Sequence, residues 1–392
     1  MTAPEDGLHP DALRTLAPAY GSGSLADLLP SVCAVLGVPG AVDVLGLTAR
    51  LDGIDRIGVL LVDGLGAYQL PLAARYAPTL ADLAAGGRGH AGTLTAGFPS
   101  TTPVSLVTLG AGVPPGVHGI LGFTVRRPDG RVLTHIHWGD DPDPRQWQPV
   151  PTWMETAAAA GVRVTVVSRP AFEGSGLSLA ANRGGAYRGA EDGPAVAAGM
   201  VEALSAGPGP ALVYGYHPDL DHFGHEDGVG SDTWRRAARG VDKLLDQVVH
   251  NLPPGAALLV VADHGQLNIP EAGRYDMAEI PALSDGVVAV AGEPRVRYLY
   301  AADGAVETVL ANWRGVFGAD ARVLARDEAI SEGWYGPVPP EHAGRIGDVV
   351  VICQRRAVAV ASGWEPDKAG RLVAYHGSVT AAEMTVPLLI VR

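Results

Sequence analysis

Four short segments of the chain are continuously apolar and rich in β-branched residues, which is typical of strands buried on both faces of a sheet. They are IGVLLVD at 57–63, VRVTVVS at 162–168, ALVYGYH at 211–217 and ALLVVAD at 257–263. Ala-rich or amphipathic segments between them predict helices at 78–86, 150–161, 194–207 and 231–252. This alternation predicts an α/β fold, with a central, mainly parallel sheet that carries helices on both faces.

The pattern changes after Asn268. The segments RVRYLYAA, AVETVLANWRGV, ARVLARDEA and RIGDVVVICQRRAVAVA predict, in this order, a strand, a helix, a short strand and a long strand. We therefore expect residues 270–370 to form a smaller inserted α+β subdomain. Residues 31–269 and 371–392 would form the metal-binding catalytic α/β core, and residues 1–30 a loosely ordered N-terminal extension.

Composition excludes several classes of protein. With 47% hydrophobic and 18% charged residues, the chain has no apolar run that approaches the roughly 20 residues of a membrane span. Its start lacks a basic region followed by an apolar one, so we expect a cytoplasmic protein without a membrane anchor. A net charge of −13 and the lack of clustered Lys and Arg argue against binding to a nucleic-acid polymer. Two cysteines in unlike contexts do not indicate a disulfide.

Six residues of metal-binding type follow predicted strands or lie in short turns. They are Asp63, Asp221, His225, Asp263, His264 and His376. Functional groups in parallel α/β folds gather at the carboxyl ends of the strands, so residues far apart in sequence can converge there. Three Asp and three His are enough to hold two adjacent divalent metal ions.

Each of these residues, taken alone, also has an ordinary structural explanation. Asp63 and the Asp263-His264 pair could cap the turns or helices that follow them. Asp221 and His225 could be solvated loop residues, and an isolated histidine such as His376 is more often structural or exposed. Only the joint presence of all six favours a metal site.

The segment FPSTTP contains two adjacent hydroxyl residues, Thr101 and Thr102, at the start of a predicted helix. A helix N-terminus offers free N–H groups and a positive field, which suit a phosphoryl oxygen and favour an ionised hydroxyl. The alternative is an ordinary N-cap. We expect His118, further along the same stretch, to fix the turn before Gly119 and not to bind metal.

In chain order, VDGLG, FPSTTP with GVPPGVHGI, DxxGH, ADHG and HGS with EMTVPLLI resemble the type I phosphodiesterase/nucleotide pyrophosphatase family of the alkaline phosphatase superfamily. The likeness runs from about residue 57 to the C-terminus. It implies an alkaline-phosphatase-like fold and two zinc ions. One zinc would be held by Asp221, His225 and His376, and the other by Asp63, Asp263 and His264.

The resemblance also implies a nucleophile and a departure from the family pattern. Counting back from Gly112 makes Thr102 the nucleophile, with Thr101 as the alternative. Phe123 stands where nucleotide-cleaving members carry an asparagine that holds a phosphoryl oxygen, which puts nucleotide pyrophosphatase activity in doubt. Phe123, Thr101 and His137 are candidate substrate-binding residues, and a loop with Arg183 and Arg188 is a second candidate for an anionic substrate.

We therefore predict a metal-dependent hydrolase of phosphate esters, most directly a two-zinc phosphodiesterase that forms a phosphothreonine intermediate on a small phosphorylated substrate. No arginine closely follows Thr102, which favours diesters over doubly charged monoesters. The alternatives are a phosphomonoesterase, a phosphonate hydrolase or a phosphomutase of the same superfamily, the last with manganese. A further alternative is a metal-containing binding protein without catalysis.

Overall fold

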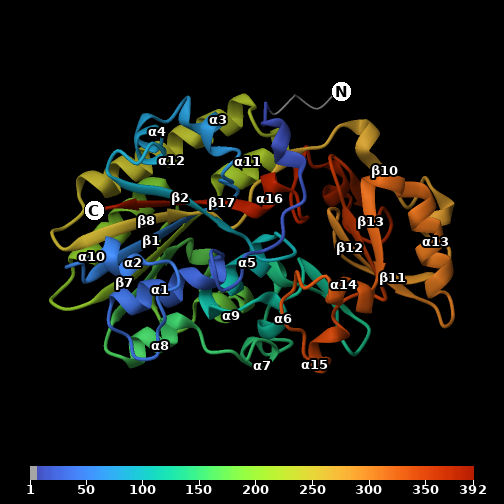
Figure 1. Cartoon of the computed structure of the whole chain (residues 1–392), viewed down its shortest axis with the longest axis horizontal. Helices are drawn as coiled ribbons and strands as arrows, with labels where there is room; N and C mark the ends of the chain where they lie inside the picture. The colour runs from blue at the N-terminus through green and yellow to red at the C-terminus, as the bar shows by residue number, and fades with distance from the viewer. Residues whose placement is uncertain (1–6) are drawn as a thin grey trace.

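A large sheet with helices on both faces lies beside a smaller sheet in the computed structural model, which describes residues 7–392 (Figure 1). The strand order of the large sheet is β2-β17-β8-β1-β7-β5-β6. Its members are β1 Arg56–Val62, β2 Gly89–Thr95, β5 Arg163–Ser168, β6 Ala186–Gly189, β7 Ala211–His217, β8 Ala256–Val261 and β17 Thr385–Val391. Only β17 runs antiparallel to its neighbours, β2 and β8. The predicted α/β class with a mainly parallel sheet is confirmed.

Helices cover both faces of this sheet (Figure 1). One face carries α3 Leu70–Ala74, α4 Pro78–Ala84, α11 Asp219–Asp227 and α12 Asp232–His250, and the other carries α1 Leu28–Val35, α5 Thr102–Ala111, α8 Trp153–Ala159 and α9 Gly176–Asn182. Along α12, apolar residues at helical spacing, such as Trp234, Val241 and Leu245, are fully buried. Ser231 caps its first turn, which explains why the helix begins there.

The smaller sheet has the order β11-β12-β14-β13, and all neighbouring strands are antiparallel. Its strands are β11 Val287–Glu293, β12 Val296–Ala301, β13 Ala321–Ala325 and β14 Val349–Cys353. Helix α13, Val306–Phe317, packs on it through Leu310, Trp313 and Phe317, within a separate apolar cluster. This sheet lies within residues 270–370, the segment predicted to form an inserted subdomain. The boundaries of that subdomain stay a prediction.

Two details of this region differ from the sequence-based expectation. The single long strand predicted at 345–361 is wrong, because β14 ends at Cys353 and β15, Val358–Val360, begins after a turn. Arg355 adopts a left-handed conformation in that turn, with φ of 47°, which no continuous strand allows. Strand β15 leaves the small sheet and pairs in parallel with β10, Arg274–Asp276.

The chain leading into α1 and the first turn of α1 pack against the large sheet. Leu25, Leu28 and Leu29 are fully buried in the main core, and single bridges join Thr15 to Thr380 and Ser24 to Thr95. Of the extension predicted at 1–30, residues 1–6 lie outside the described residues, and the part that follows contains the short helices η1 Pro10–Leu13 and η2 Leu25–Asp27. Cys33 and Cys353 are buried and free, as expected.

Helices of residues 7–392 are all too short or too polar to reach across a lipid bilayer. The cytoplasmic location expected from the sequence stays a prediction.

Candidate active site

The carboxyl ends of three neighbouring strands lie level with one another. In the register of the sheet, Val62 of β1 faces His217 of β7, and Leu61 faces Val261 of β8. The next residues of each chain segment therefore enter the same edge of the sheet, which places Asp63 and Asp263 side by side. This alignment is the reason that motifs from distant parts of the chain meet here.

The first group of candidate ligands is Asp63, Asp263 and His264, whose possible ligand atoms all lie within 4.8 Å of one another. Their side chains are at most 3% exposed. His264 Nε2 lies 3.5 Å from Asp63 Oδ1 and 3.3 Å from Asp263 Oδ2. The Thr102 hydroxyl oxygen is 3.1 Å from the same nitrogen, so the predicted nucleophile lies directly beside this group.

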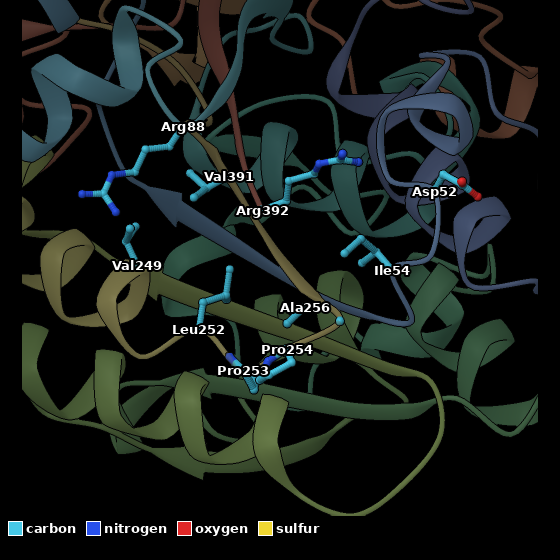
Figure 2. A pocket seen from close by; sticks show the side chains of 11 residues that line it. Asp52, Ile54, Arg88, Val249, Leu252, Pro253, Pro254, Ala256, Val391 and Arg392 are labelled. Atoms are coloured by element: carbon cyan, nitrogen blue, oxygen red, sulfur yellow. The ribbon is translucent and has the colours of Figure 1, made fainter.

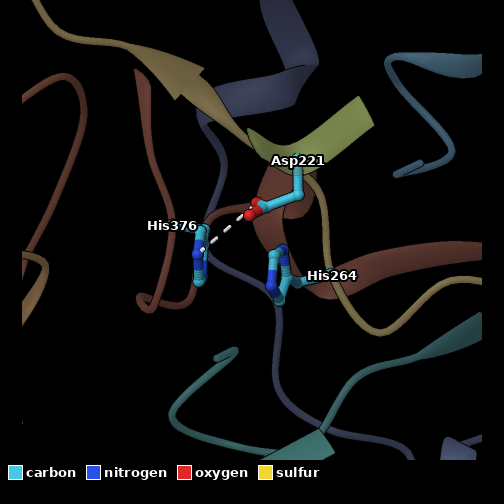
Figure 3. A group of neighbouring side chains, drawn as sticks. All are labelled: Asp221, His264 and His376. Atoms are coloured by element: carbon cyan, nitrogen blue, oxygen red, sulfur yellow. Dashed lines mark ion pairs between the residues drawn. The ribbon is translucent and has the colours of Figure 1, made fainter. Parts of the chain in front are cut away.

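The second group is Asp221, His225 and His376. His225 Nε2 is 3.4 Å from Asp221 Oδ1 and 3.1 Å from His376 Nε2, and His376 Nε2 is 3.8 Å from the same carboxylate oxygen. Figure 3 shows His264 beside Asp221 and His376, and the possible ligand atoms of these three are again within 4.8 Å of one another. The rings of His264 and His376 stack with centroids 3.5 Å apart, so the two groups adjoin at His264.

Hydrogen bonds fix which nitrogen of each imidazole faces the site. His225 Nδ1 is 2.8 Å from the Ala374 carbonyl oxygen, and His376 Nδ1 is 3.0 Å from the Ser100 carbonyl oxygen. A carbonyl only accepts, so Nδ1 carries the proton in both rings and Nε2 presents a lone pair. Two lone pairs and the Asp221 carboxylate oxygen thus converge, an arrangement that a bound cation stabilises.

The electrostatics of the first group also favour a bound cation. Burial, with the charges of Asp263 and Asp221, raises the pKa of Asp63 well above its ordinary value, although the Tyr216 hydroxyl donates a hydrogen bond to this carboxylate. Burial also raises the pKa of Asp263. Among residues 7–392, Asp63 Oδ1 and Asp263 Oδ2 are buried without any hydrogen-bond partner. Orphaned buried carboxylate oxygens are costly, and oxygen and imidazole ligands together suit a divalent ion such as zinc or manganese.

A glycine allows the close approach of the elements that carry the ligands. Gly64 follows Asp63 with φ of 73°, and a Cβ atom built on it would lie 2.9 Å from Cα of Asp221. A side chain there would therefore push β1 and α11 apart, in addition to straining the backbone. The VDGLG motif thus supplies both a candidate ligand and the space for a candidate ligand from another element.

All seven residues of the predicted metal and nucleophile sets lie together, whereas the predicted substrate-binding residues differ in their positions. Thr101 is fully buried at the N-cap of α5, and Phe123 is half-buried just before the short strand β3, Thr124–Arg126. His137 is exposed on the turn His135–His137. In the described part of the chain, neither Phe123 nor His137 has a hydrogen bond or ion pair to the six candidate ligands, so their contact with substrate stays a prediction.

The loop proposed as a second anion site has no free arginine. Arg183 is 7% exposed and lies 2.8 Å from Glu155, and Arg188 pairs with Glu202. Arg183 is paired in the interior and Arg188 at the surface, so contact of this loop with an anionic substrate stays a prediction. The interpretation of His118 is supported: its ring is fully buried, lies 3.0 Å from the Thr108 hydroxyl and accepts a hydrogen bond from the Ile120 amide.

The sequence reading missed two residues that contact the candidate ligands. Tyr216 donates to Asp63, and the Gln266 side-chain amide donates to the carboxylate and, at 3.1 Å, to the backbone carbonyl of Asp221. Tyr216 lies one residue before the end of β7, and Gln266 lies two residues after His264. Neither position has a spacing that identifies a role, because each acts on a ligand from another element.

A cavity of about 560 Å³ opens at the opposite edge of the large sheet (Figure 2). It lies at the amino ends of β1 and β8, between Ile54, Ala256 and the C-terminal Arg392. None of the six candidate ligands lines it. The candidate active site is therefore defined by its convergent polar groups and not by this cavity.

A family model described as "Type I phosphodiesterase / nucleotide pyrophosphatase" matches residues 58–379. No curated protein matches the chain by sequence. Among solved structures, human ectonucleotide pyrophosphatase/phosphodiesterase 5 is similar with a TM-score of 0.68, at 16% identity over 86% of this chain and 87% of that chain.

Two further structures are similar. An inactive threonine-to-alanine form of murine ectonucleotide pyrophosphatase/phosphodiesterase 5, in complex with AMP, has a TM-score of 0.67 at 18% identity, over 85% of this chain and 87% of that chain. Phosphonoacetate hydrolase from Sinorhizobium meliloti 1021, in complex with phosphonoacetate, has a TM-score of 0.62 at 20% identity, over 87% of this chain and 90% of that chain. At these identities the structures show a shared fold.

Proposed function

Because the chain belongs to the type I phosphodiesterase/nucleotide pyrophosphatase family and is a metal-dependent phosphoric ester hydrolase, we propose that it is a phosphodiesterase with two zinc ions and Thr102 as its nucleophile. In this proposal Asp221, His225 and His376 hold one ion, and Asp63, Asp263 and His264 hold the other. The substrate is a small phosphorylated molecule.

The position of Thr102 carries this proposal. Its hydroxyl is 3.1 Å from His264 Nε2, at the point where the two ligand groups adjoin. Thr102 is half-buried, whereas Thr101 is fully buried, so only Thr102 combines access for a substrate with contact to the candidate ligands. Thr102 is also the first residue of α5, where free N–H groups can bind phosphoryl oxygens.

Bound divalent ions would lower the pKa of the threonine hydroxyl and offset negative charge on the reacting phosphoryl group and leaving oxygen. Thr102 Oγ1 would attack phosphorus and form a phosphothreonine, while the bond to the leaving alcohol breaks. Water would then hydrolyse this ester and restore the threonine. The N–H groups at the start of α5 would orient the phosphoryl oxygens. The Phe123 side chain has no hydrogen-bond donor and would not share this role.

The structural neighbours support the same assignment and a second candidate. One of them is inactive as a threonine-to-alanine form and binds AMP, which is consistent with a threonine nucleophile in this fold. Another is a phosphonoacetate hydrolase with bound phosphonoacetate. Phosphonate hydrolysis is therefore the second candidate function, because the fold and the kinds of residue in the site are compatible with either a P–O or a P–C substrate.

A Thr102→Ala substitution tests the proposal. With bis-p-nitrophenyl phosphate, p-nitrophenyl phosphate and phosphonoacetate as substrates, we expect the wild type to prefer the diester. The variant should lose at least about 10³-fold in kcat, because the alternative hydroxyl, that of Thr101, is fully buried and cannot replace the nucleophile. Metal content measured by mass spectrometry should stay at two zinc ions per chain in both proteins.

Thr102→Ser is the matched control, since it keeps the hydroxyl and should retain part of the activity. Undiminished turnover by Thr102→Ala would reject the nucleophile. A preference for phosphonoacetate would favour the second candidate, and manganese with mutase activity would favour a phosphomutase. A protein that binds metal but converts none of these substrates would favour a binding role.

A further inference from the structure

Glu293 reaches the candidate active site from the small sheet. It is the last residue of β11, and its side chain is 5% exposed. A Cβ atom built on Gly377 would lie 2.7 Å from the Glu293 carboxyl carbon. The carboxyl group therefore packs directly against the backbone of the residue that follows the candidate ligand His376.

The same side chain also faces the turn that carries the proposed nucleophile. Burial raises the pKa of Glu293 to about 8, and the Thr101 hydroxyl and the charge of Arg297 act against this shift. Within residues 7–392, Glu293 has no ion pair, and its Oε1 is buried without a hydrogen-bond partner. Such a carboxyl group costs folding free energy, so a role in stability alone does not explain it.

The two segments that Glu293 touches are joined to each other. The Ser100 amide donates to the Gly377 carbonyl at 2.9 Å, and the Ser100 carbonyl accepts from His376 Nδ1 at 3.0 Å. Ser100 precedes Thr101 and Thr102, so this pairing links the orientation of the His376 ring to the start of α5. Glu293 packs at this junction.

A buried ion pair holds Glu293 at the junction. Arg295, two residues further along the chain, donates to both oxygens of Glu383 at 2.8 and 2.6 Å, and both side chains are fully buried. Glu383 in turn accepts from the Ser378 amide at 2.9 Å. The turn between β11 and β12 is thus tied to the segment that contains Gly377.

We propose that Glu293 is a positioning residue, which sets the geometry of Thr102 and His376 by wedging between Thr101 and Gly377. This role rests on the proposed function of Thr102. In this role the small sheet contributes to catalysis, because Glu293 lies at the end of β11 and the Arg295–Glu383 pair holds the turn that follows. A displacement of about 1 Å at reacting groups can cost up to about 100-fold in rate.

Glu293→Ala and Glu293→Gln test this role, with Glu332→Gln as the control. Glu332 pairs with Arg322 in the same part of the chain and contacts none of the candidate site residues. For cleavage of bis-p-nitrophenyl phosphate by the zinc-loaded protein, we expect Glu293→Ala to lower kcat roughly 10- to 100-fold with KM within about twofold. Glu293→Gln, which fills the same volume, should recover part of this loss, and the control should match the wild type.

Hydrogen exchange gives a readout that does not depend on substrate. In Glu293→Ala, amides of residues 98–104 and 374–380 should exchange faster than in the wild type, while the remaining segments and the zinc content stay unchanged. If the wild type cleaves no phosphoester but this local exchange change occurs, the proposed function fails and the positioning role is supported. If kcat of Glu293→Ala stays within about twofold of wild type, or exchange at both segments is unchanged, the positioning role is overturned.

Discussion

Two buried polar groups of this protein differ in how their charges are satisfied. In the Arg295–Glu383 pair, both side chains are fully buried, and Glu383 accepts hydrogen bonds from Arg295, the Ser378 amide and the Thr380 hydroxyl. In the pair Asp63 and Asp263, two buried carboxylates lie together, and each has an oxygen without a hydrogen-bond partner among the described residues. The first group is complete within the protein, whereas the second has unpaired oxygens that the proposed cation would satisfy.

This difference separates a structural polar cluster from a functional one. Burial alone does not distinguish them, because both are removed from water. An unpaired buried carboxylate costs folding free energy, and such a cost is found where a ligand offsets it. Without metal, neutralising a carboxylate should therefore destabilise the first group and stabilise the second, and withdrawing the metal should affect only the second.

Removal of metal should have the largest effect on stability. Ions that bind only the folded chain stabilise it by about 4 kcal/mol when their free concentration is a thousand times Kd. We expect a chelator to lower Tm and the free energy of unfolding, and added zinc to restore both, as measured by calorimetry. An unchanged Tm in chelator would contradict a metal at the Asp63 and Asp263 group. Glu383→Gln serves as the comparison. Because the Arg295–Glu383 pair is complete without metal, the chelator should lower Tm by the same amount in this variant as in the wild type.

Glu383→Gln should cost about 3 kcal/mol in the free energy of unfolding, because it leaves the Arg295 guanidinium buried without its charge partner. Urea unfolding with and without metal measures this loss, which should be similar in both conditions. A cost below about 1 kcal/mol would show that the pair does not hold the β11–β12 turn.

His135 provides a pH test in a satisfied region of the fold. Its ring lies 2.8 Å from the Gly122 carbonyl oxygen and accepts from the Trp147 indole, and burial lowers its pKa to about 4. The unfolded chain binds a proton near pH 6.5 while the folded chain does not, so stability is present above that pH and lost as pH falls from 6.5 towards 4. The loss from this group is about 1.4 kcal/mol per pH unit in that window.

The corresponding variant is His135→Gln, which keeps an acceptor for Trp147. We expect urea unfolding at pH 7.5 and 5.5 to show a smaller loss of stability on acidification in the variant than in the wild type. Equal losses in both proteins would show that His135 is not held neutral by the fold.

Asp263→Asn should have the smallest effect on stability, and without metal this effect should be stabilising. In chelator, neutralising Asp263 relieves repulsion from Asp63, so the variant should be more stable than the wild type by about 1 kcal/mol. With zinc present the order should reverse, because the variant has lost a ligand. Thermal unfolding in chelator and in zinc measures whether the order of the two stabilities reverses. A variant that is less stable in both would place Asp263 with the structural polar residues.

Local sequence determined most of the elements that build the large sheet. The apolar runs predict β1, β5, β7 and β8 to within about two residues, since strands buried on both faces need continuous apolar side chains. The helix predicted after the Ser-Thr-Thr-Pro turn is α5, although it begins inside that turn, at Thr102. The sequence also contains the motif order that assigns the family, which the family model confirms.

Other features depended on contacts that no local pattern encodes. Tyr216 and Gln266 act on Asp63 and Asp221, which lie far from them in sequence, and Arg183 is neutralised by Glu155. Each of these contacts depends on side-chain directions in two separate elements. The strand predicted across Arg355 was interrupted for a similar reason, because β15 pairs with β10 and not with the small sheet.

Residue type and periodicity therefore determined the strands, the helices and the candidate ligand set of this protein, since these properties act over a few neighbouring residues. Only the tertiary structure decided that His264 adjoins both ligand groups, that Thr102 and not Thr101 lies beside it, and that Glu293 arrives from the other sheet. Sheet register and packing set these distances, and both depend on the whole chain.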